Sequence, residues 1–485
     1  MSLVQTSKMT NWRWVMCAML FLATTVNYMD RQVLSLTWKD FISPEFHWND
    51  EIYGNITAVF SIFYAIANLF AGKFVDWMGT KKGYFWAIVV WSLGAVMHAG
   101  CGMFTEGWMG EGFQNAADLI QATGDVAVTI ATVSMYAFLA CRCILALGEA
   151  GNFPAAIKVT AEYFPKKDRA FATSIFNAGA SVGALAAPAT IPLLAKAMGW
   201  EMAFIIIGGI GFLWAGAWIF MYEKPSKSKY VNEAELLYVN QDEADENTPA
   251  AATEEKEEKT MSYAQAFSYK QTWAFAFGKF MTDGVWWFFL FWAPAYFSDQ
   301  YGYTSDSVMG IALIFTLYAI VTVLSMFGGY LPKLFVEKKG MNPYQGRMLA
   351  MLIFAFFPVL ALFAQPMGQY SAWWPAIIIG LVGAGHQAWS ANIFSTVGDM
   401  FPKSAIATIT GIGAMAGGVG SFLINKGSGK LFTYAAEQGE AFQFFGFDGK
   451  PAGYMIIFCV CAVAYLIGWF VMKALVPKYK PIILD

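Results

Sequence analysis

The chain has 485 residues, of which 57% are hydrophobic and 13% charged, and its formal net charge is −3. Soluble proteins carry about 25% charged residues, so this composition excludes a soluble globular protein and predicts a polytopic membrane protein. The small net charge gives no reason to expect a nucleic-acid partner. Three histidines, and six cysteines that lie in or beside apolar stretches, predict packing residues, so neither a metal site nor a cofactor is expected.

Apolar stretches long enough to cross a bilayer recur twelve times along the chain. We place them at 14–37, 52–73, 83–104, 133–155, 170–195, 201–222, 271–297, 306–331, 347–365, 372–398, 405–427 and 452–474. Each must be a helix, because lipid cannot satisfy the polar groups of an irregular backbone. The excess of Lys and Arg in one set of loops predicts that both termini and the central loop are cytoplasmic.

An acidic segment divides the chain into two halves. Residues 225–259 hold ten acidic residues and few large apolar ones, which predicts a solvated linker that is either helical or disordered. We therefore expect an N-terminal six-helix bundle at 1–222, a cytoplasmic acidic linker at 223–270 and a C-terminal six-helix bundle at 271–485. This all-α layout around a central cavity is typical of transporters built from repeats. The outward segments 105–132 and 428–451 are longer than a connection needs, and we expect them to form small caps.

The first predicted span ends with the sequence Asn-Tyr-Met-Asp-Arg, which contains Tyr28, Asp30 and Arg31. At ~1.5 Å per residue, Asp30 lies roughly 25 Å along the helix from Arg13, within a hydrocarbon core of ~30 Å. A charge at that depth costs at least a few kcal/mol unless it is paired or faces water. Two interpretations stay open: these residues form a functional site, or they mark the outer end of the helix in the headgroup region.

The loop after the second span combines two glycines, an acidic residue and a pair of adjacent lysines within residues 72–82. Glycine permits close helix approach and a tight turn there, and the aspartate can cap a helix or pair with a cation. The residues are Gly72, Asp76, Gly79, Lys81 and Lys82. The alternative is an ordinary positively charged cytoplasmic turn with a chance aspartate.

The fourth span contains Arg142 and Glu149, which lie on one helix face two turns apart. Lipid exposure of this face would be very costly, so the face must point into the bundle. It is either a proton or substrate site, or an internal ion pair that links the fourth span to the first.

Polar residues also interrupt the seventh and tenth spans. Lys279, Asp283 and Trp286 share one face of the seventh span, at i, i+4 and i+7. This face can present a cation to a ligand carboxylate and an aromatic ring to the ligand's C–H groups, or Lys279 and Asp283 can simply neutralise each other. In the tenth span His386 is either a ligand-binding residue or a satisfied core histidine. Its neighbours Gln387, Ser390 and Asn392 can hydrogen-bond hydroxyl groups.

These motifs resemble those of a known transporter family. The loop pattern G-x-x-x-D-x-x-G-x-[RK]-[RK] resembles the loop-2/3 signature of the major facilitator superfamily. Within it, the resemblance to the anion:cation symporter family rests on Tyr28-x-Asp30-Arg31, Arg142 with Glu149, and Tyr163-Phe164-Pro165 followed by Arg169. The likeness to its bacterial hexuronate transporters rests on Phe176-Asn177-x-Gly179, Gly278-Lys279-Phe280 and His386-Gln387-Ala388-x-Ser390.

The resemblance implies a transporter in the bacterial inner membrane that imports a hexuronate, such as glucuronate or galacturonate, by proton symport. It implies that the loop after the second span helps to close a gate, and that proton coupling falls on Asp30, Arg142 and Glu149. The residues expected to bind substrate are Tyr28, Arg31, Tyr64, Asn177, Lys279, Trp286, His386, Gln387, Ser390 and Asn392. In aldonate-type relatives a neutral amide stands at the position of Lys279.

Several alternatives stay open at this stage. One alternative is that the substrate is another organic anion, such as an aldonate or tartrate. Another is that transport is coupled to Na⁺ instead of protons. A membrane-embedded enzyme would need a metal cluster or an activated nucleophile, and a channel would lack the repeated six-helix layout. The expected partners are the lipid bilayer, a small anionic sugar acid and protons, and we expect a monomer.

Overall fold

The computed structural model describes residues 8–241, 261–325, 328 and 330–483, without the side chains at 76, 166, 167, 169–171, 173, 174, 397–399, 403, 404 and 407. The described chain is helical apart from one small hairpin, in which β1 (Gln443–Phe444) pairs with β2 (Phe447–Asp448). The predicted all-α fold is confirmed, and this hairpin is its one addition within the described residues.

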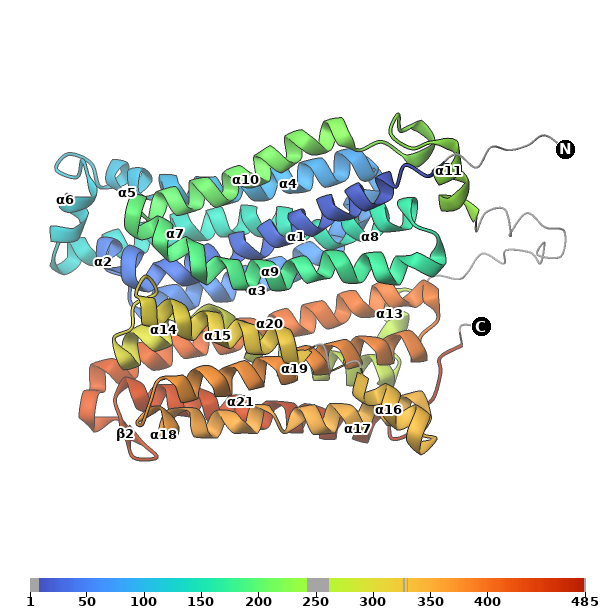
Figure 1. Ribbon diagram of the computed structural model, residues 1–485. Helices are drawn as coiled ribbons and strands as arrows, with labels where there is room; N and C mark the ends of the chain where they lie inside the picture. The colour runs from blue at the N-terminus through green and yellow to red at the C-terminus, as the bar shows by residue number, and fades with distance from the viewer. Residues whose placement is uncertain (1–7, 242–260, 326–327, 329, 484–485) are drawn as a thin grey trace, which may run out of the picture.

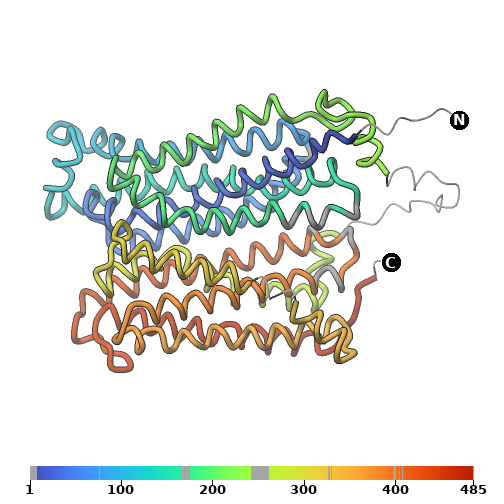
Figure 2. The backbone as a smooth tube through the Cα atoms, viewed as in Figure 1, coloured from blue at the N-terminus to red at the C-terminus, as the bar shows by residue number. Residues whose placement is uncertain are grey.

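The first half forms one helical bundle, drawn from blue to green in Figure 2. Its main helices are α1 (Trp12–Thr37), α3 (Asp50–Met78), α4 (Thr80–Met97), α7 (Gly124–Glu149) continued by α8 (Asn152–Tyr163), α9 (Lys166–Met198) and α10 (Trp200–Met221). Shorter elements connect them: η1 (Trp38–Ile42), α2 (Ser43–Phe46), η2 (His98–Gly100), α5 (Cys101–Met109) and α6 (Ala116–Gln121).

The second half forms the other bundle, drawn from yellow to red. Its main helices are α14 (Lys270–Tyr301), α15 (Val308–Ser325), α17 (Pro343–Ala355), α19 (Trp373–Met400), α20 (Lys403–Gln438) and α21 (Lys450–Leu475). Shorter elements are η3 (Pro225–Lys227), α11 (Glu233–Val239), α13 (Tyr263–Ala266), α16 (Tyr330–Lys339), η4 (Pro358–Phe363), α18 (Ala364–Gly368) and η5 (Gly439–Ala441), the first three of which lie within the predicted linker, 223–270.

The two bundles lie side by side with their helices roughly parallel, and both chain termini lie at the same end (Figure 1). Across the interface α3 packs against α20. Glycines allow this close approach: a Cβ atom added at Gly54 would come within 2.9 Å of the Gly429 Cα. The interface therefore has little room for side chains here, which brings the polar residues of the two halves near each other.

Nine helical stretches of the described chain are long and apolar enough to cross a membrane. Helices α1, α14 and α19 are also long enough to cross a membrane, with 26, 32 and 28 residues. They are not among the nine because they are not apolar enough. These three helices carry the polar residues that the sequence analysis selected, because Asp30 and Arg31 lie on α1, Lys279 on α14 and His386 on α19. The three long helices that miss the apolarity criterion are thus those that carry most of the predicted polar site residues.

The expected caps are smaller than the sequence indicated. In the segment 105–132, α5 continues to Met109 and α7 begins at Gly124, so only the stretch around α6 stands apart. In the segment 428–451, α20 runs on to Gln438, where Gly439 adopts a positive φ of 55°. Both differences have one cause: the helices extend beyond their apolar parts, so hydropathy underestimates their length.

The beginning of the predicted solvated linker is folded against α1. Glu235 of α11 is buried, accepts hydrogen bonds from the backbone N–H groups of Trp12 and Arg13 at 3.0 Å each, and pairs with the Arg13 guanidinium at 3.1 Å. Tyr230 stacks on Trp12 with ring centroids 4.1 Å apart. This part of the linker therefore caps the first helix, and linker residues 242–260 lie outside the described residues.

A ring of charges joins the two halves at the end opposite the termini. Lys39 lies 2.8 Å from Asp299 and 3.8 Å from Asp50, and Lys450 contacts the same two carboxylates. Lys39 and Asp50 belong to the first half, whereas Asp299 and Lys450 belong to the second. The halves are therefore held together at this end by ion pairs, and nothing in the sequence pattern had singled out these residues.

Candidate functional site

Arg31 occupies the centre of the site in the first half. Its Nε lies 3.1 Å from Glu149 Oε2, and its Nη2 donates to the Tyr64 hydroxyl at 3.2 Å. The guanidinium carbon also lies 5.1 Å from the Tyr28 ring centroid and 5.2 Å from that of Trp287. Because Trp287 belongs to α14, Arg31 touches the second half of the protein. Three predicted binding residues, Tyr28, Arg31 and Tyr64, are thus brought together.

Asp30 and Arg142 flank this cluster. Asp30 Oδ2 accepts a hydrogen bond from the Trp91 indole at 2.7 Å. Arg142 lies with its guanidinium carbon 4.3 Å from the Phe60 ring centroid, and its Nη2 reaches the Arg31 carbonyl at 3.5 Å. Glu149 is therefore paired with Arg31 on α1 rather than with Arg142 on its own helix. The geometry is that of an ion pair between the first and fourth spans.

Several buried atoms of this cluster have no hydrogen-bond partner among the described residues. They are Asp30 Oδ1, Glu149 Oε1, Arg142 Nε and Nη1, and both side-chain polar atoms of Asn27 and Gln32. Each such group costs about 1–3 kcal/mol relative to a satisfied one. The unbonded carboxylate oxygens can accept a proton, and the unbonded Arg142 N–H groups can donate to an anion, without a described hydrogen bond having to break first.

The second half contributes a more self-contained pair. Lys279 Nζ lies 2.8 Å from Asp283 Oδ2, one turn away on α14. The ammonium group also lies 4.3 Å from the Phe394 ring centroid. The Lys279 and Asp283 side chains are 7% and 14% exposed, so the pair is largely buried but not sealed from solvent. Lys279 is thus neutralised in this structure, and it can offer its charge to a ligand only by sharing or leaving Asp283.

His386 sits in a defined aromatic and hydrogen-bonded setting. Its ring is parallel to Trp286, with centroids 5.6 Å apart and planes 2° apart. Its Nδ1 lies 2.6 Å from the Tyr465 hydroxyl, which in turn donates to the Thr282 carbonyl oxygen at 3.2 Å. Tyr465 lies on α21, and the sequence pattern gave no reason to select it, because a tyrosine in an apolar span is indistinguishable from an ordinary packing residue.

The remaining predicted binding residues are less concentrated. Gln387 and Ser390 are half-buried beside His386 on α19. Asn392 is buried, and its amide donates to the Gly328 and Ala388 carbonyls at 3.1 and 2.8 Å, so it ties α19 to the turn residue Gly328 between α15 and α16. Asn177 on α9 is exposed. Trp91 and Tyr465 contact predicted site residues although the sequence gave no signal for them, and Trp287, next to the selected Trp286, is the tryptophan that meets Arg31.

The predicted gating residues lie where α3 turns into α4. Gly79 adopts a φ of 79°, a conformation that glycine tolerates best. Lys81 pairs with Glu223 after α10, while Lys82 is exposed and Gly72 is half-buried within α3. The side chain of Asp76 lies outside the described residues. This turn is therefore tied to the end of the first bundle, and its gating role stays a prediction.

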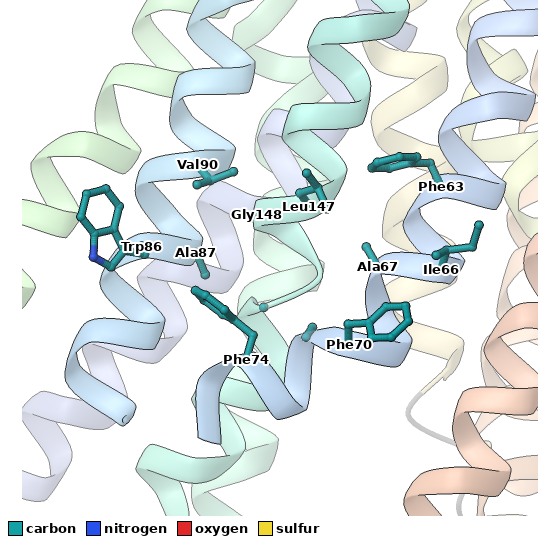
Figure 3. A pocket seen from close by; sticks show the side chains of 12 residues that line it. Phe63, Ile66, Ala67, Phe70, Phe74, Trp86, Ala87, Val90, Leu147 and Gly148 are labelled. Atoms are coloured by element: carbon teal, nitrogen blue, oxygen red, sulfur yellow. The ribbon is translucent and has the colours of Figure 1, made fainter. Parts of the chain in front are cut away.

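A groove of about 350 Å³ opens on the first bundle between α3, α4 and α7 (Figure 3). Its lining is apolar and includes Phe70, Trp86 and Leu147, which are each about half exposed or more. Such a surface suits lipid chains and offers no group that could recognise an anion. The groove is therefore not the candidate site, although Gly148 on its wall neighbours Glu149.

The sequence model of the Major Facilitator Superfamily matches residues 20–424. The "Hexuronate transporter" of Escherichia coli (strain K12) is 27% identical over 467 residues, covering 96% of this chain and 94% of that protein. A "Probable galactarate/D-glucarate transporter" of the same organism is 24% identical, covering 92% of this chain and 94% of that protein. The crystal structure of a D-xylose-proton symporter has the same fold, with a TM-score of 0.66, 15% identity, and coverage of 97% of this chain and 98% of that one.

Proposed function

Because the chain belongs to the Major Facilitator Superfamily, whose matched relatives here are transporters and not enzymes, we propose that it imports a hexuronate by proton symport. The protein is a multi-pass membrane protein that handles a small sugar acid. Glucuronate and galacturonate are the substrates we favour, and both termini are assigned to the cytoplasm. The chain works as a monomer in the bacterial inner membrane.

The observation that carries this proposal is the position of Arg31. Its guanidinium lies between Glu149 and Tyr64 of the first half and Trp287 of the second. A guanidinium offers a planar fork of donors that matches a carboxylate, and such charge-assisted bonds are strong. A substrate carboxylate that binds here would contact both halves at once, as a carrier with alternating access requires.

The second half supplies contacts for the rest of a sugar acid. Lys279 offers a further cation, and Trp286 offers a flat apolar face for the C–H groups of a sugar ring. Gln387, Ser390 and Asn392 offer donors and acceptors for hydroxyl groups, of which Asn392 is already bonded within the protein. Asn177 on α9 is the most peripheral of the proposed contacts.

Proton coupling is assigned to the carboxylates of the first half. A substrate carboxylate and Glu149 compete for the same guanidinium, so substrate binding releases Glu149 and favours its protonation. Among the described residues Asp30 has the Trp91 indole as its one hydrogen-bond partner, and Arg142 lies close enough to interact with either carboxylate. The proton neutralises the carboxylate that has lost its partner, so the loaded carrier moves without an unpaired buried charge.

Uptake into proteoliposomes tests the proposal. With an imposed pH gradient, the protein should accumulate glucuronate and galacturonate, and a Na⁺ gradient of equal size should not substitute. Thermal stabilisation of the purified protein by a panel of uronates, aldonates, aldarates and tartrate would rank the substrates. Accumulation driven by Na⁺ alone would overturn proton coupling, and stabilisation by aldonates or tartrate without uronates would overturn the substrate assignment.

A further inference from the structure

Three groups in the second half form a hydrogen-bonded chain across three helices. The Tyr465 hydroxyl of α21 lies 3.2 Å from the Thr282 carbonyl oxygen of α14 and 2.6 Å from His386 Nδ1 of α19. Tyr465 is fully buried, so its hydroxyl cannot exchange these partners for water. The direction in which hydrogens run along this chain decides which nitrogen of His386 carries a hydrogen.

The hydrogens can be counted. A phenol has one hydrogen, and a carbonyl oxygen can only accept. If the phenol donates to His386 Nδ1, the two oxygens of Tyr465 and Thr282 face each other at 3.2 Å without a hydrogen between them. If the phenol donates to Thr282, then His386 must donate from Nδ1 to the phenol oxygen. The second arrangement makes two hydrogen bonds in a buried site and the first makes only one, so the second is favoured.

The other ring nitrogen faces accessible space. No hydrogen bond from a described residue reaches His386 Nε2, and this atom is not among the unpartnered atoms that are sealed from solvent. The residue keeps 5% of its surface exposed. The ring cannot turn freely, because Trp286 stacks on it with parallel planes. A neutral imidazole with its hydrogen on Nδ1 therefore presents a fixed lone pair at Nε2.

We infer that Tyr465 is a positioning residue that sets the tautomer of His386, and that His386 Nε2 accepts a hydrogen bond from a substrate hydroxyl. This inference rests on the proposed function. A hydroxyl can donate to the lone pair, whereas an ionised carboxylate carries no hydrogen and would be repelled by it. The site therefore selects sugar acids with a single carboxylate over dicarboxylic aldarates, in which a carboxylate replaces the distal hydroxyl-bearing end.

The tautomer can be read directly. The chain has three histidines, so a ¹⁵N NMR spectrum of the protein labelled at histidine holds few signals, and the His386→Gln spectrum assigns those of His386. In the wild-type protein we expect the hydrogen on Nδ1. In Tyr465→Phe we expect a shift towards Nε2–H, the form that free histidine favours. A wild-type spectrum with the hydrogen on Nε2 overturns the inference, whatever transport shows.

Selectivity provides the second test. Binding of glucuronate and glucarate is compared in the wild-type protein, Tyr465→Phe and the exposed control Tyr434→Phe. The ratio of the two affinities should fall about tenfold in Tyr465→Phe, the effect of one unmatched polar contact, and should not change in Tyr434→Phe. An unchanged ratio in Tyr465→Phe with the expected tautomer change would overturn the selective role and leave hexuronate transport intact. If the wild-type protein binds no sugar acid, the proposed function fails while the tautomer result stands.

Discussion

Helix α1 pairs with a buried glutamate at two places, and the two pairs differ in how completely they are bonded. Near its first turn, Arg13 lies 3.1 Å from Glu235, and in its second half Arg31 lies 3.1 Å from Glu149. Both glutamates are essentially unexposed. Glu235 also accepts bonds from Thr10 and from two backbone N–H groups. Glu149 has one partner, and its Oε1 has none among the described residues.

This difference indicates which of the two carboxylates can change its protonation state and its partner. A carboxylate with every oxygen bonded is held in one charge state and one position, because protonation would break several bonds. A carboxylate with one partner loses that partner to a competing anion and then binds a proton. We therefore regard the Glu235 pair as structural and the Glu149 pair as the working one. The Lys279–Asp283 pair of the second half lies between them, since it is mutually neutralised but still accessible.

The largest expected effect comes from removing the shared cation of the working pair. Arg31→Ala should abolish substrate binding and uptake, a loss of at least about a hundredfold, given the strength of a charge-assisted fork. Arg31→Lys should also lose most substrate binding and uptake, because the point charge of an ammonium group does not replace the planar fork of a guanidinium. Isothermal titration with glucuronate and uptake in proteoliposomes are the measurements.

A matched double variant separates binding from folding. Removing Arg31 alone leaves Glu149 buried and unpaired, which costs about 3–5 kcal/mol. Arg31→Ala combined with Glu149→Gln removes both charges, so its stability should recover while binding stays lost. Normal binding in either variant would remove Arg31 from the substrate site.

The next effect concerns coupling rather than binding. Glu149→Gln mimics the protonated carboxylate, so it should bind substrate and exchange it across the membrane, yet lose at least about tenfold in accumulation on a pH gradient, which is about 1.4 kcal/mol of coupling. Asp30→Asn should likewise lose accumulation, with binding better preserved than in Arg31→Ala. Accumulation and exchange are measured side by side in proteoliposomes. Full accumulation by both variants would assign coupling to another carboxylate, with Asp283 the next candidate.

A smaller effect is expected in the second half. Lys279→Gln should weaken hexuronate binding by about tenfold, since a surviving amide can still hydrogen-bond, and should relax the preference for uronates over aldonates. Asp283→Asn sharpens the comparison, because it frees the ammonium group from its partner and should strengthen uronate binding if that partner competes with substrate. Unchanged binding constants in Lys279→Gln would show that the Lys279–Asp283 pair is structural, like the Arg13–Glu235 pair.

Much of this arrangement was predictable from the sequence. Hydropathy located twelve helices, because lipid requires each span to be helical, and the charges on α1 and α7 had to point inward because lipid exposure is too costly. The partner of Glu149 was not predictable: spacing places Arg142 on the same helix face, but contacts between helices depend on how they pack. The roles of Trp91 and Tyr465 were hidden for a related reason, since one indole or phenol among many apolar residues gives no periodic signal.

The charged ring of Lys39, Asp50, Asp299 and Lys450 illustrates the same limit. Each residue lies near the end of a predicted span, where a charge is ordinary, so no single position indicates a function. Only the meeting of two halves that are far apart in sequence turns these four residues into one cluster. The burial of Glu235 in the linker was not predictable for a similar reason, because an acidic composition does not show which carboxylate packs against α1.

The smallest effect is expected at the structural pair, where Glu235→Gln should lower stability without touching coupling. The glutamine puts an NH₂ group against backbone N–H donors and loses the charge that faces Arg13, at a cost of about 1–2 kcal/mol. Hydrogen exchange at the Trp12 and Arg13 amides should become faster, and Glu233→Gln, an exposed change on the same helix, is the control.

Burial alone would raise the pKa of Glu235, but hydrogen bonds from Thr10 and from the start of α1 outweigh burial and lower the pKa. Its contribution to stability is therefore present above the unfolded pKa of about 4.3 and is lost as the pH falls through the lower, folded value. In the wild-type protein, protection of the Trp12 and Arg13 amides from hydrogen exchange should fall over that acidic pH range. In Glu235→Gln the protection of the same amides should not change with pH in this way. If Glu235→Gln lost proton-driven accumulation as Glu149→Gln does, the number of bonds to a buried carboxylate would not distinguish a structural pair from a working one.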